Sequence, residues 1–293
     1  MITHLFQQGP AIGGTLRLLT AGKGKGTPEL PGAWLTQTVG PRSPALVADY
    51  LRVVGGDPKA WAGRLPPHMF PQWGWALITR TLHGLPYDLT KVVNAGCSWR
   101  ATAPLFADQP LALQARLLSI DDDGCRALIV VELKTGTAEL PDALVSTLTV
   151  FCPLPAPKDR EKVARDKPTV PANARALGER RLPANQGWRF ALVTGDFNPI
   201  HWVGPYAKLA GFGGVILHGF GTAAVAAELL IKSRLAGDVN GLLGIDARFT
   251  RPLRLPATAT VFTTDGKTDQ GAHPLYVGTA PGGPAFLVGG FHV

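Results

Sequence analysis

Apolar residues recur at helical spacing in two stretches of the chain. In the clearer stretch, residues 219–234, they follow one another at steps of three and four, and no charge precedes Glu228. This pattern predicts a helix that is apolar on most of its faces and is therefore buried. From Phe70 to Leu82 a similar spacing predicts a second helix, in the first half of the chain.

Four short apolar runs follow each predicted helix, and turn residues separate the runs. They lie near residues 89–101, 110–119, 124–134 and 141–151 in the first half, and near residues 241–251, 257–265, 274–280 and 284–292 in the second. Asp123-Gly124 and Asp265-Gly266 are typical of turns between antiparallel strands. The sequence therefore predicts the α+β class, with one buried helix and one antiparallel sheet in each half.

The two halves look like diverged copies of one unit. The entrance to the first helix, Pro66-Pro67-His68-Met69-Phe70, is similar to Ile216-Leu217-His218-Gly219-Phe220 at the second. Two sheets placed side by side can join and cover the edges that a single copy leaves exposed. We therefore expect two helix-in-sheet units that pack as an internal pseudo-dimer.

A segment rich in proline and charge separates the two halves. Residues 153–175 lack apolar periodicity and are expected to form an exposed linker between a first unit, residues 1–152, and a second unit, residues 176–293. Part of the formal net charge of +8 lies there, from Lys158 to Lys167. Acidic residues interrupt this basic run, which favours a solvated linker over a binding site.

Composition narrows the class of protein. Of the 293 residues, 45% are hydrophobic and 17% charged, as in globular proteins. Cys97, Cys125 and Cys152 are too few for a disulfide framework, which favours structural thiols in a reducing, cytoplasmic compartment. The first residues do not resemble a signal peptide, and no apolar run is long enough to span a membrane.

The stretch Thr194-Gly195-Asp196-Phe197-Asn198-Pro199-Ile200-His201 is the most informative part of the sequence. Its glycine, asparagine and proline predict a loop between a short amphipathic segment and the buried helix. Such a loop presents Asp196 and His201 from one rigid turn. A carboxylate and an imidazole that converge can hold a water molecule and move its proton. Taken singly, each residue is better explained by a structural role, in a turn or in the core.

The entrance to the buried helix offers a second chemical group. Backbone N–H groups at a helix N-terminus are unpaired and lie at the positive end of the helix dipole. Gly219 has no side chain, so a substrate oxygen can approach its N–H, as the stabilisation of an oxyanion on a thioester requires. The alternative is that Gly219 only permits tight packing. We expect His218 to be structural, because its counterpart His68 lies in a half without other site residues.

The run from Phe190 to His201 resembles the signature of the MaoC-like, or hydratase 2, family. The entrance Leu217-His218-Gly219 and the run Arg248-Phe249-Thr250-Arg251-Pro252-Leu253 also match habits of that family. The resemblance is firm over residues 176–293, whereas the first half resembles, more weakly, the degenerate unit of double-hotdog members. It implies a double hotdog fold, in which sheets wrap long helices, and the reversible hydration of trans-2-enoyl thioesters to (3R)-3-hydroxyacyl thioesters.

Residue by residue, the resemblance makes Asp196 and His201 the pair that activates water. It implies that Asn198 orients the loop and that the N–H of Gly219 polarises the thioester carbonyl. We expect no redox cofactor and no metal, because hydration of an activated double bond uses only water, an acid–base pair and an oxyanion site. Coenzyme A or acyl carrier protein is expected as part of the substrate thioester. Acyl-chain length, the choice of carrier, the direction of the reaction, and the choice between monomer and homodimer stay open.

The first half lacks the catalytic pair. Its corresponding stretch, Val54-Gly55-Gly56-Asp57-Pro58-Lys59, has no asparagine and no histidine at the required spacing, so we expect one active site per chain. Met69, Trp73 and Trp75 are candidates for the lining of an acyl-chain tunnel, although ordinary core packing explains each of them. Candidates for binding the phosphates of coenzyme A or an acidic carrier are Arg180, Arg181, Arg248, Arg251 and Arg254.

Three other functions are less well supported. A hotdog thioesterase also places a carboxylate at the buried helix, but nothing in that activity calls for the loop from Asp196 to His201. A non-catalytic acyl-binding protein has no need of an intact pair. Positive charge attracts any polyanion, but no nucleic-acid motif is present, so we expect neither nucleic acid nor a membrane as a partner. Residues 22–27, which superficially suggest a phosphate loop, lack its glycine spacing and are expected to be a flexible loop.

Overall fold

The computed structural model describes residues 2–20, 22–155 and 167–293. Its strands are β1 (Leu35–Val39), β2 (Val93–Ala101), β3 (Leu111–Asp122), β4 (Arg126–Gly136), β5 (Leu144–Pro153), β6 (Arg175–Leu182), β7 (Gly244–Phe249), β8 (Ala257–Thr263), β9 (His273–Gly278) and β10 (Ala285–His292). Its helices are α1 (Gly9–Thr20), α2 (Pro44–Val54), α3 (Pro58–Trp61), α4 (Phe70–Thr81), α5 (Gln186–Thr194), α6 (Gly204–Leu209) and α7 (Gly219–Arg234). Short 3-10 turns are η1 (Ile2–Gln7), η2 (Pro67–Met69), η3 (Leu89–Lys91) and η4 (Pro199–His201).

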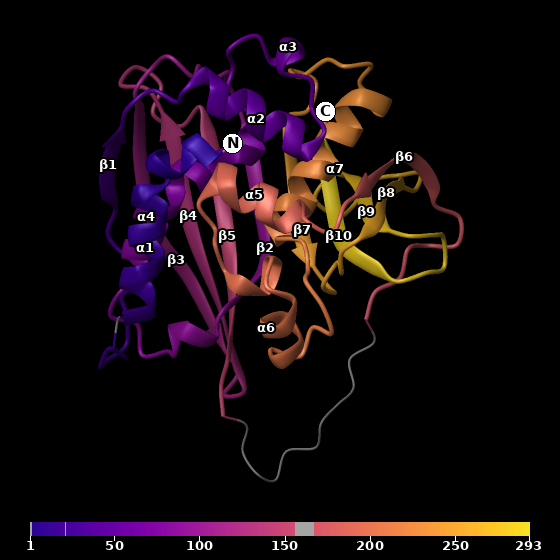
Figure 1. Cartoon of the computed structure of the whole chain (residues 1–293). Coiled ribbons are helices and arrows are strands. Elements are labelled where there is room, and N and C mark those ends of the chain that lie inside the picture. The colour runs from indigo at the N-terminus through magenta and orange to yellow at the C-terminus, as the bar shows by residue number, and fades with distance from the viewer. Residues whose placement is uncertain (1, 21, 156–166) are drawn as a thin grey trace.

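All these strands lie in one antiparallel sheet with the order β1-β3-β4-β5-β2-β7-β10-β9-β8-β6. The first five in this order belong to the first half of the chain and the last five to the second. The halves meet where β2 pairs with β7, and Figure 1 shows the main helices in front of the sheet. The predicted α+β class and the predicted joining of two sheets are therefore confirmed.

The same order of elements occurs twice. An edge strand, a helix, a short helical turn, a buried helix and four strands follow one another in each half, as β1-α2-α3-α4 before β2–β5 and as β6-α5-η4-α7 before β7–β10, with α6 added in the second half. The helix α4 packs on β1, β3 and β4, whereas α7 packs on β6, β8, β2 and β7. This arrangement is the predicted pair of helix-in-sheet units.

One further similarity between the two halves was not predicted from the sequence. The run Arg100-Ala101-Thr102-Ala103-Pro104-Leu105, which leaves β2, is similar to the run of six residues that begins at Arg248 on β7. The backbone bonds match as well, because Leu65 N donates to Leu105 O at 2.8 Å and Leu217 N donates to Leu253 O at the same distance. The two helix entrances are therefore held to the sheet in the same way.

Both edge strands were missed by the sequence analysis. β1, Leu-Thr-Gln-Thr-Val, and β6, which carries three arginines and a glutamate, have few apolar residues. They lie at the two ends of the sheet, where each pairs on one side only. Polar and charged side chains at a sheet edge discourage pairing with other chains, and they also hide the apolar alternation by which a strand is recognised.

The two central helices agree closely with expectation. α7 covers residues 219–234 as predicted, and its apolar side chains are buried along most of its length. α4 begins at Phe70, and Leu82 forms its C-cap. Met69 and Trp73 are buried in the core, and Trp73 Nε1 donates to the hydroxyl of Thr135. Core packing is therefore the observed role of these two residues.

Some expectations fall partly outside the described residues. Most of the basic run from Lys158 to Lys167 lies within residues 156–166, and the proposed boundaries at 153 and 175 stay a prediction. Residues 22–27 form neither helix nor strand. Cys97 and Cys152 are buried, whereas Cys125 is partly exposed. Within the described ranges, no helix has the length and hydropathy needed to cross a bilayer.

Candidate active site

The loop that carries Asp196 begins at the end of a helix. α5 ends at Thr194, and its C-cap is Gly195, whose φ of 83° lies in the left-handed region that glycine tolerates best. A Cβ at this position would also lie 2.9 Å from the Cβ of Ala11, so the N-terminal helix leaves no room for a side chain. The sequence predicts only a short amphipathic segment before the loop, without assigning it to a helix. The observed helix fixes where the loop starts.

Asn198 organises the next turn. Its side-chain oxygen accepts a hydrogen bond from Ile200 N at 3.2 Å and so caps η4, the turn that ends at His201. Its own N–H donates to Asp196 Oδ1 at 3.3 Å. Asn198 therefore contacts the candidate carboxylate through its backbone and directs the chain toward the histidine through its side chain.

His201 is buried and held in one orientation. Its Nδ1–H donates to the carbonyl of Ile216 at 2.9 Å, which leaves Nε2 with the lone pair. Burial lowers the pKa of His201, and the negative charge of Asp196 offsets part of that effect. A neutral imidazole with an unprotonated Nε2 is the form that can accept a proton from water.

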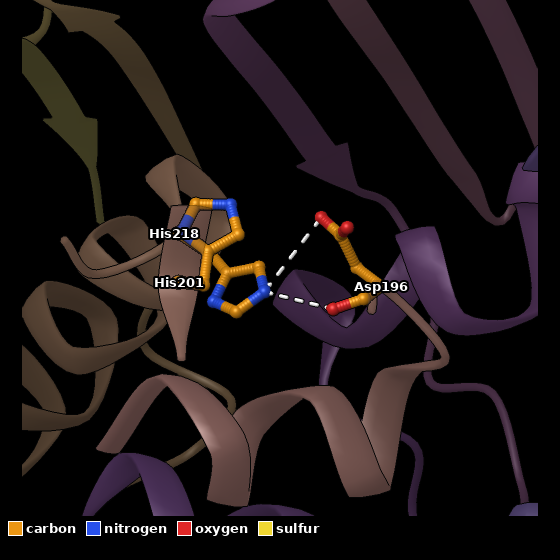
Figure 2. Close-up of side chains that lie close together, drawn as sticks. All are labelled: Asp196, His201 and His218. Atoms are coloured by element: carbon orange, nitrogen blue, oxygen red, sulfur yellow. Dashed lines mark hydrogen bonds and ion pairs between the residues drawn. The ribbon is translucent and has the colours of Figure 1, made fainter. Parts of the chain in front are cut away.

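His218 completes the cluster. Its ring stacks on that of His201, with 3.5 Å between centroids and 22° between planes. Its Nε2–H donates to the backbone carbonyl of Asp196 at 3.0 Å and lies 3.8 Å from the carboxylate. Burial, and then the nearby His201, lower the pKa of His218 to about 3, so this ring is also neutral. Figure 2 shows Asp196 facing the two stacked rings.

Asp196 stands at the open side of this cluster. Its side chain is 44% exposed, whereas the side chain of His218 is 1% exposed. The carboxylate thus remains in contact with solvent while the imidazoles lie behind it. The structure therefore brings Asp196, His201 and Asn198 together and adds His218, which the sequence analysis assigned to a structural role. Its position before a buried helix gave no indication of the stacking.

Gly219 starts α7 directly after His218. The side chain of His218 does not cap the helix. A Cβ on Gly219 would lie 2.6 Å from Cε2 of Phe249, so the ring of Phe249 packs against this residue. The packing explanation for this glycine is therefore observed. The polarisation of a substrate oxygen by its N–H stays a prediction.

The five candidate arginines lie in different surroundings. Arg254 packs over Gly213, just before the entrance to α7. Arg180 donates to the carbonyls of Arg52 and Val53, and Arg251 to those of Lys167 and Pro168. Arg181 and Arg248 are exposed. Because Phe249 faces α7, its neighbour Arg248 points to the opposite face of the sheet. Arg254 is thus the candidate that lies beside the segment leading into α7.

The cluster also has the composition of a metal site. Asp196, His201 and His218 each offer one ligand atom, and these atoms lie within 4.8 Å of one another. Two of the imidazole nitrogens already donate to backbone carbonyls. The expectation that the reaction needs no metal stays a prediction.

Comparisons with known proteins find similarity to MaoC-like proteins. Residues 161–278 match a family described as MaoC like domain. The chain is 28% identical over 256 residues to 3-hydroxyacyl-thioester dehydratase X of Mycobacterium tuberculosis, covering 82% of this chain and 83% of that protein. It is 26% identical over 182 residues to the peroxisomal enoyl-CoA hydratase 2 of Arabidopsis thaliana, covering 57% and 58%. The crystal structure of a MaoC-like dehydratase from Phytophthora capsici superposes with a TM-score of 0.69 at 18% identity, covering 94% of this chain and 96% of that one.

Proposed function

We propose that this chain, whose residues 161–278 match the family described as MaoC like domain, is a hydro-lyase that adds water to trans-2-enoyl thioesters. The observation that carries the proposal is the convergence of a half-exposed carboxylate and a neutral, oriented imidazole at the N-terminus of a buried helix. The names of the related dehydratase and hydratase support the reaction class. The specific product we propose is the (3R)-3-hydroxyacyl thioester, as the family resemblance implies.

In the proposed reaction, a water molecule lies between Asp196 and Nε2 of His201. As its oxygen attacks C3 of the enoyl group, Nε2 takes a proton from the water and the C2=C3 electron pair moves onto the thioester oxygen as an enolate. The N–H of Gly219 stabilises this oxyanion. The Asp196–His201 pair then returns a proton to C2, so that one water has been added. Dehydration follows the same steps in reverse.

His218 has a supporting part in this mechanism. Because it is neutral and donates to the carbonyl of Asp196, it holds the loop without placing a positive charge beside His201. A charged neighbour would disfavour protonation of His201, which the first step requires. The stacked, neutral His218 thus orients His201 and does not lower its pKa as a neighbouring positive charge would.

The carrier and the assembly belong to the proposal as well. We propose an acyl group carried by coenzyme A or by acyl carrier protein, with Arg254 as the residue placed to meet an anionic carrier. The catalytic loops lie within one chain, so the mechanism works for a monomer and equally for a homodimer. A cytoplasmic location fits the three cysteines that the sequence assigns to a reducing compartment.

The test is the stereochemistry of turnover. Purified protein would be incubated with trans-2-enoyl-CoA of short, medium and long chain, and with the same groups on acyl carrier protein. The 3-hydroxyacyl product would be separated by chiral chromatography. We expect the R enantiomer from at least one series. An S product would overturn the stereochemical assignment, and the absence of any hydration would leave a non-catalytic acyl-binding protein as the better explanation.

A further inference from the structure

A second carboxylate–imidazole pair lies buried where the two halves meet. Glu228, in the middle of α7, accepts a hydrogen bond from Nε2–H of His68 at 3.0 Å. The same oxygen, Oε1, accepts from Nε1–H of Trp61, also at 3.0 Å. Tyr50 OH lies 3.0 Å from Nδ1 of His68 on the other side of the ring. None of these four side chains belongs to the proposed active site.

This cluster is the counterpart of the catalytic site in the first half. The C-cap of α2 is Gly55 in the left-handed region, as that of α5 is Gly195. The residue that follows is Gly56 in the first half and Asp196 in the second. A Cβ on Gly56 would lie 2.5 Å from Cδ of Glu228. The carboxylate of Glu228 thus fills the space that a loop carboxylate of the first half would occupy.

The cluster is closed to substrate. The four residues are between 1% and 4% exposed, and Trp61 covers the carboxylate on the side of the α3 turn. A buried carboxylate needs its hydrogen-bond donors, because an uncompensated charge in the interior costs several kcal/mol. The donors of Glu228 belong to the first half, whereas Glu228 itself belongs to α7. The position of α7 along its axis is therefore tied to the first half of the chain.

We propose that Glu228 is a positioning residue for the reaction assigned to the second half, an inference that rests on the proposed function. Glu228 stands nine residues after Gly219, which is about 13.5 Å along a rigid helix. At the N-terminal end of that helix, His218 must remain stacked on His201 and bonded to the Asp196 carbonyl. The bonds at Glu228 fix the helix at one end so that these contacts are kept at the other.

The first experiment compares three variants under conditions in which circular dichroism shows each to be folded. Glu228→Leu removes both hydrogen bonds, whereas Glu228→Gln keeps an oxygen that can accept them. Leu230→Ala is the matched control, because it empties space on the same buried helix without removing a hydrogen bond. For Glu228→Leu we expect kcat to fall about tenfold or more with KM nearly unchanged, since misplacement of about 1 Å is that costly.

The control variants distinguish a positioning role of Glu228 from a general effect of destabilising the buried helix. Glu228→Gln and Leu230→Ala are expected to keep kcat within about threefold of wild type, well short of the loss that misplacement causes. The proposal is overturned if kcat of Glu228→Leu equals that of wild type. It is also overturned if Leu230→Ala lowers kcat by as large a factor as Glu228→Leu does. Should Glu228→Leu fail to fold, Trp61→Phe removes one donor only and is expected to lower kcat in the same direction by a smaller factor.

A readout that does not need turnover separates this proposal from the proposed function. The imidazole nitrogens of His201 and His218 would be observed by nitrogen-15 NMR in wild type and variants. Glu228→Leu is expected to shift both sets of resonances, and Leu230→Ala to leave them in place. Shifted resonances in a protein that hydrates no thioester would refute the hydratase and keep the mechanical link. Unshifted resonances in Glu228→Leu would refute the link.

Discussion

Acidification should destabilise the fold through His218. This ring is buried, neutral and bonded to the carbonyl of Asp196. Burial, and secondarily the neighbouring His201, lower its pKa from 6.5 to about 3. The perturbation is a change from pH 7 to pH 5, which protonates the histidine in the unfolded chain but not in the folded one.

The sign and size of the effect follow from the two pKa values. Because the unfolded state binds the proton first, stability that is fully present above pH 6.5 is lost as the pH falls from 6.5 toward 3. Each pH unit in that window costs about 1.4 kcal/mol, so at pH 5 the loss from His218 is about 2 kcal/mol. The pKa of His201 is also lowered, chiefly by burial, and it adds a loss of the same sign.

The assay is urea unfolding of wild type and His218→Gln at both pH values. Glutamine keeps a donor near the Asp196 carbonyl but does not titrate. Carboxylates elsewhere lose stability equally in both proteins, so the difference between the two losses isolates His218. We expect wild type to lose about 2 kcal/mol more than the variant between pH 7 and pH 5. Equal losses would show that burial does not hold His218 neutral.

Three further predictions concern the loop and the helix entrance. The acidic limb of the profile of kcat/KM against pH should have an apparent pKa below 6.5, because burial lowers that of His201, and a limb centred above 6.5 would contradict this assignment. Gly219→Ala should lower the free energy of unfolding by about 1–3 kcal/mol, because the added methyl group overpacks against Phe249. In thermal unfolding, the double variant Gly219→Ala/Phe249→Ala should lose less stability than the two single variants together, and strictly additive losses would mean that the two residues do not clash. Asn198→Ala should cost about 1 kcal/mol by loss of the η4 cap, whereas Asn198→Asp, which can cap equally, should cost little in the same assay.

Much of the fold could be predicted because its strongest patterns are local. α7 and α4 repeat their apolar residues at helical spacing, and the eight inner strands are short apolar runs separated by turn residues such as glycine and aspartate. The edge strands β1 and β6 could not be found in this way, because their side chains are polar. α2 and α5 were missed for another reason. They are short helices packed against each other, and their apolar residues serve a contact that only the tertiary structure defines.

The candidate site was predictable only where one loop carries its residues. Asp196, Asn198 and His201 lie within six residues, so turn residues between them were enough to suggest convergence. His218 joins them through stacking, which depends on how the loop returns to α7 through the hydrogen bond from Ile216 N to Ile200 O. Phe249 approaches Gly219 from the sheet. The bond between Glu228 and His68 joins residues from different halves, and no pattern in the sequence relates their spacing.

The central claim is that Asp196 and His201 add water to an enoyl thioester. The most direct measurement is the loss of enoyl-thioester absorbance when trans-2-enoyl-CoA is mixed with wild type or with Asp196→Asn. We expect rapid loss with wild type and a rate lower by a factor of about 100 or more with the variant, the scale on which a positioned acid–base group acts. Equal rates in the two proteins would contradict it.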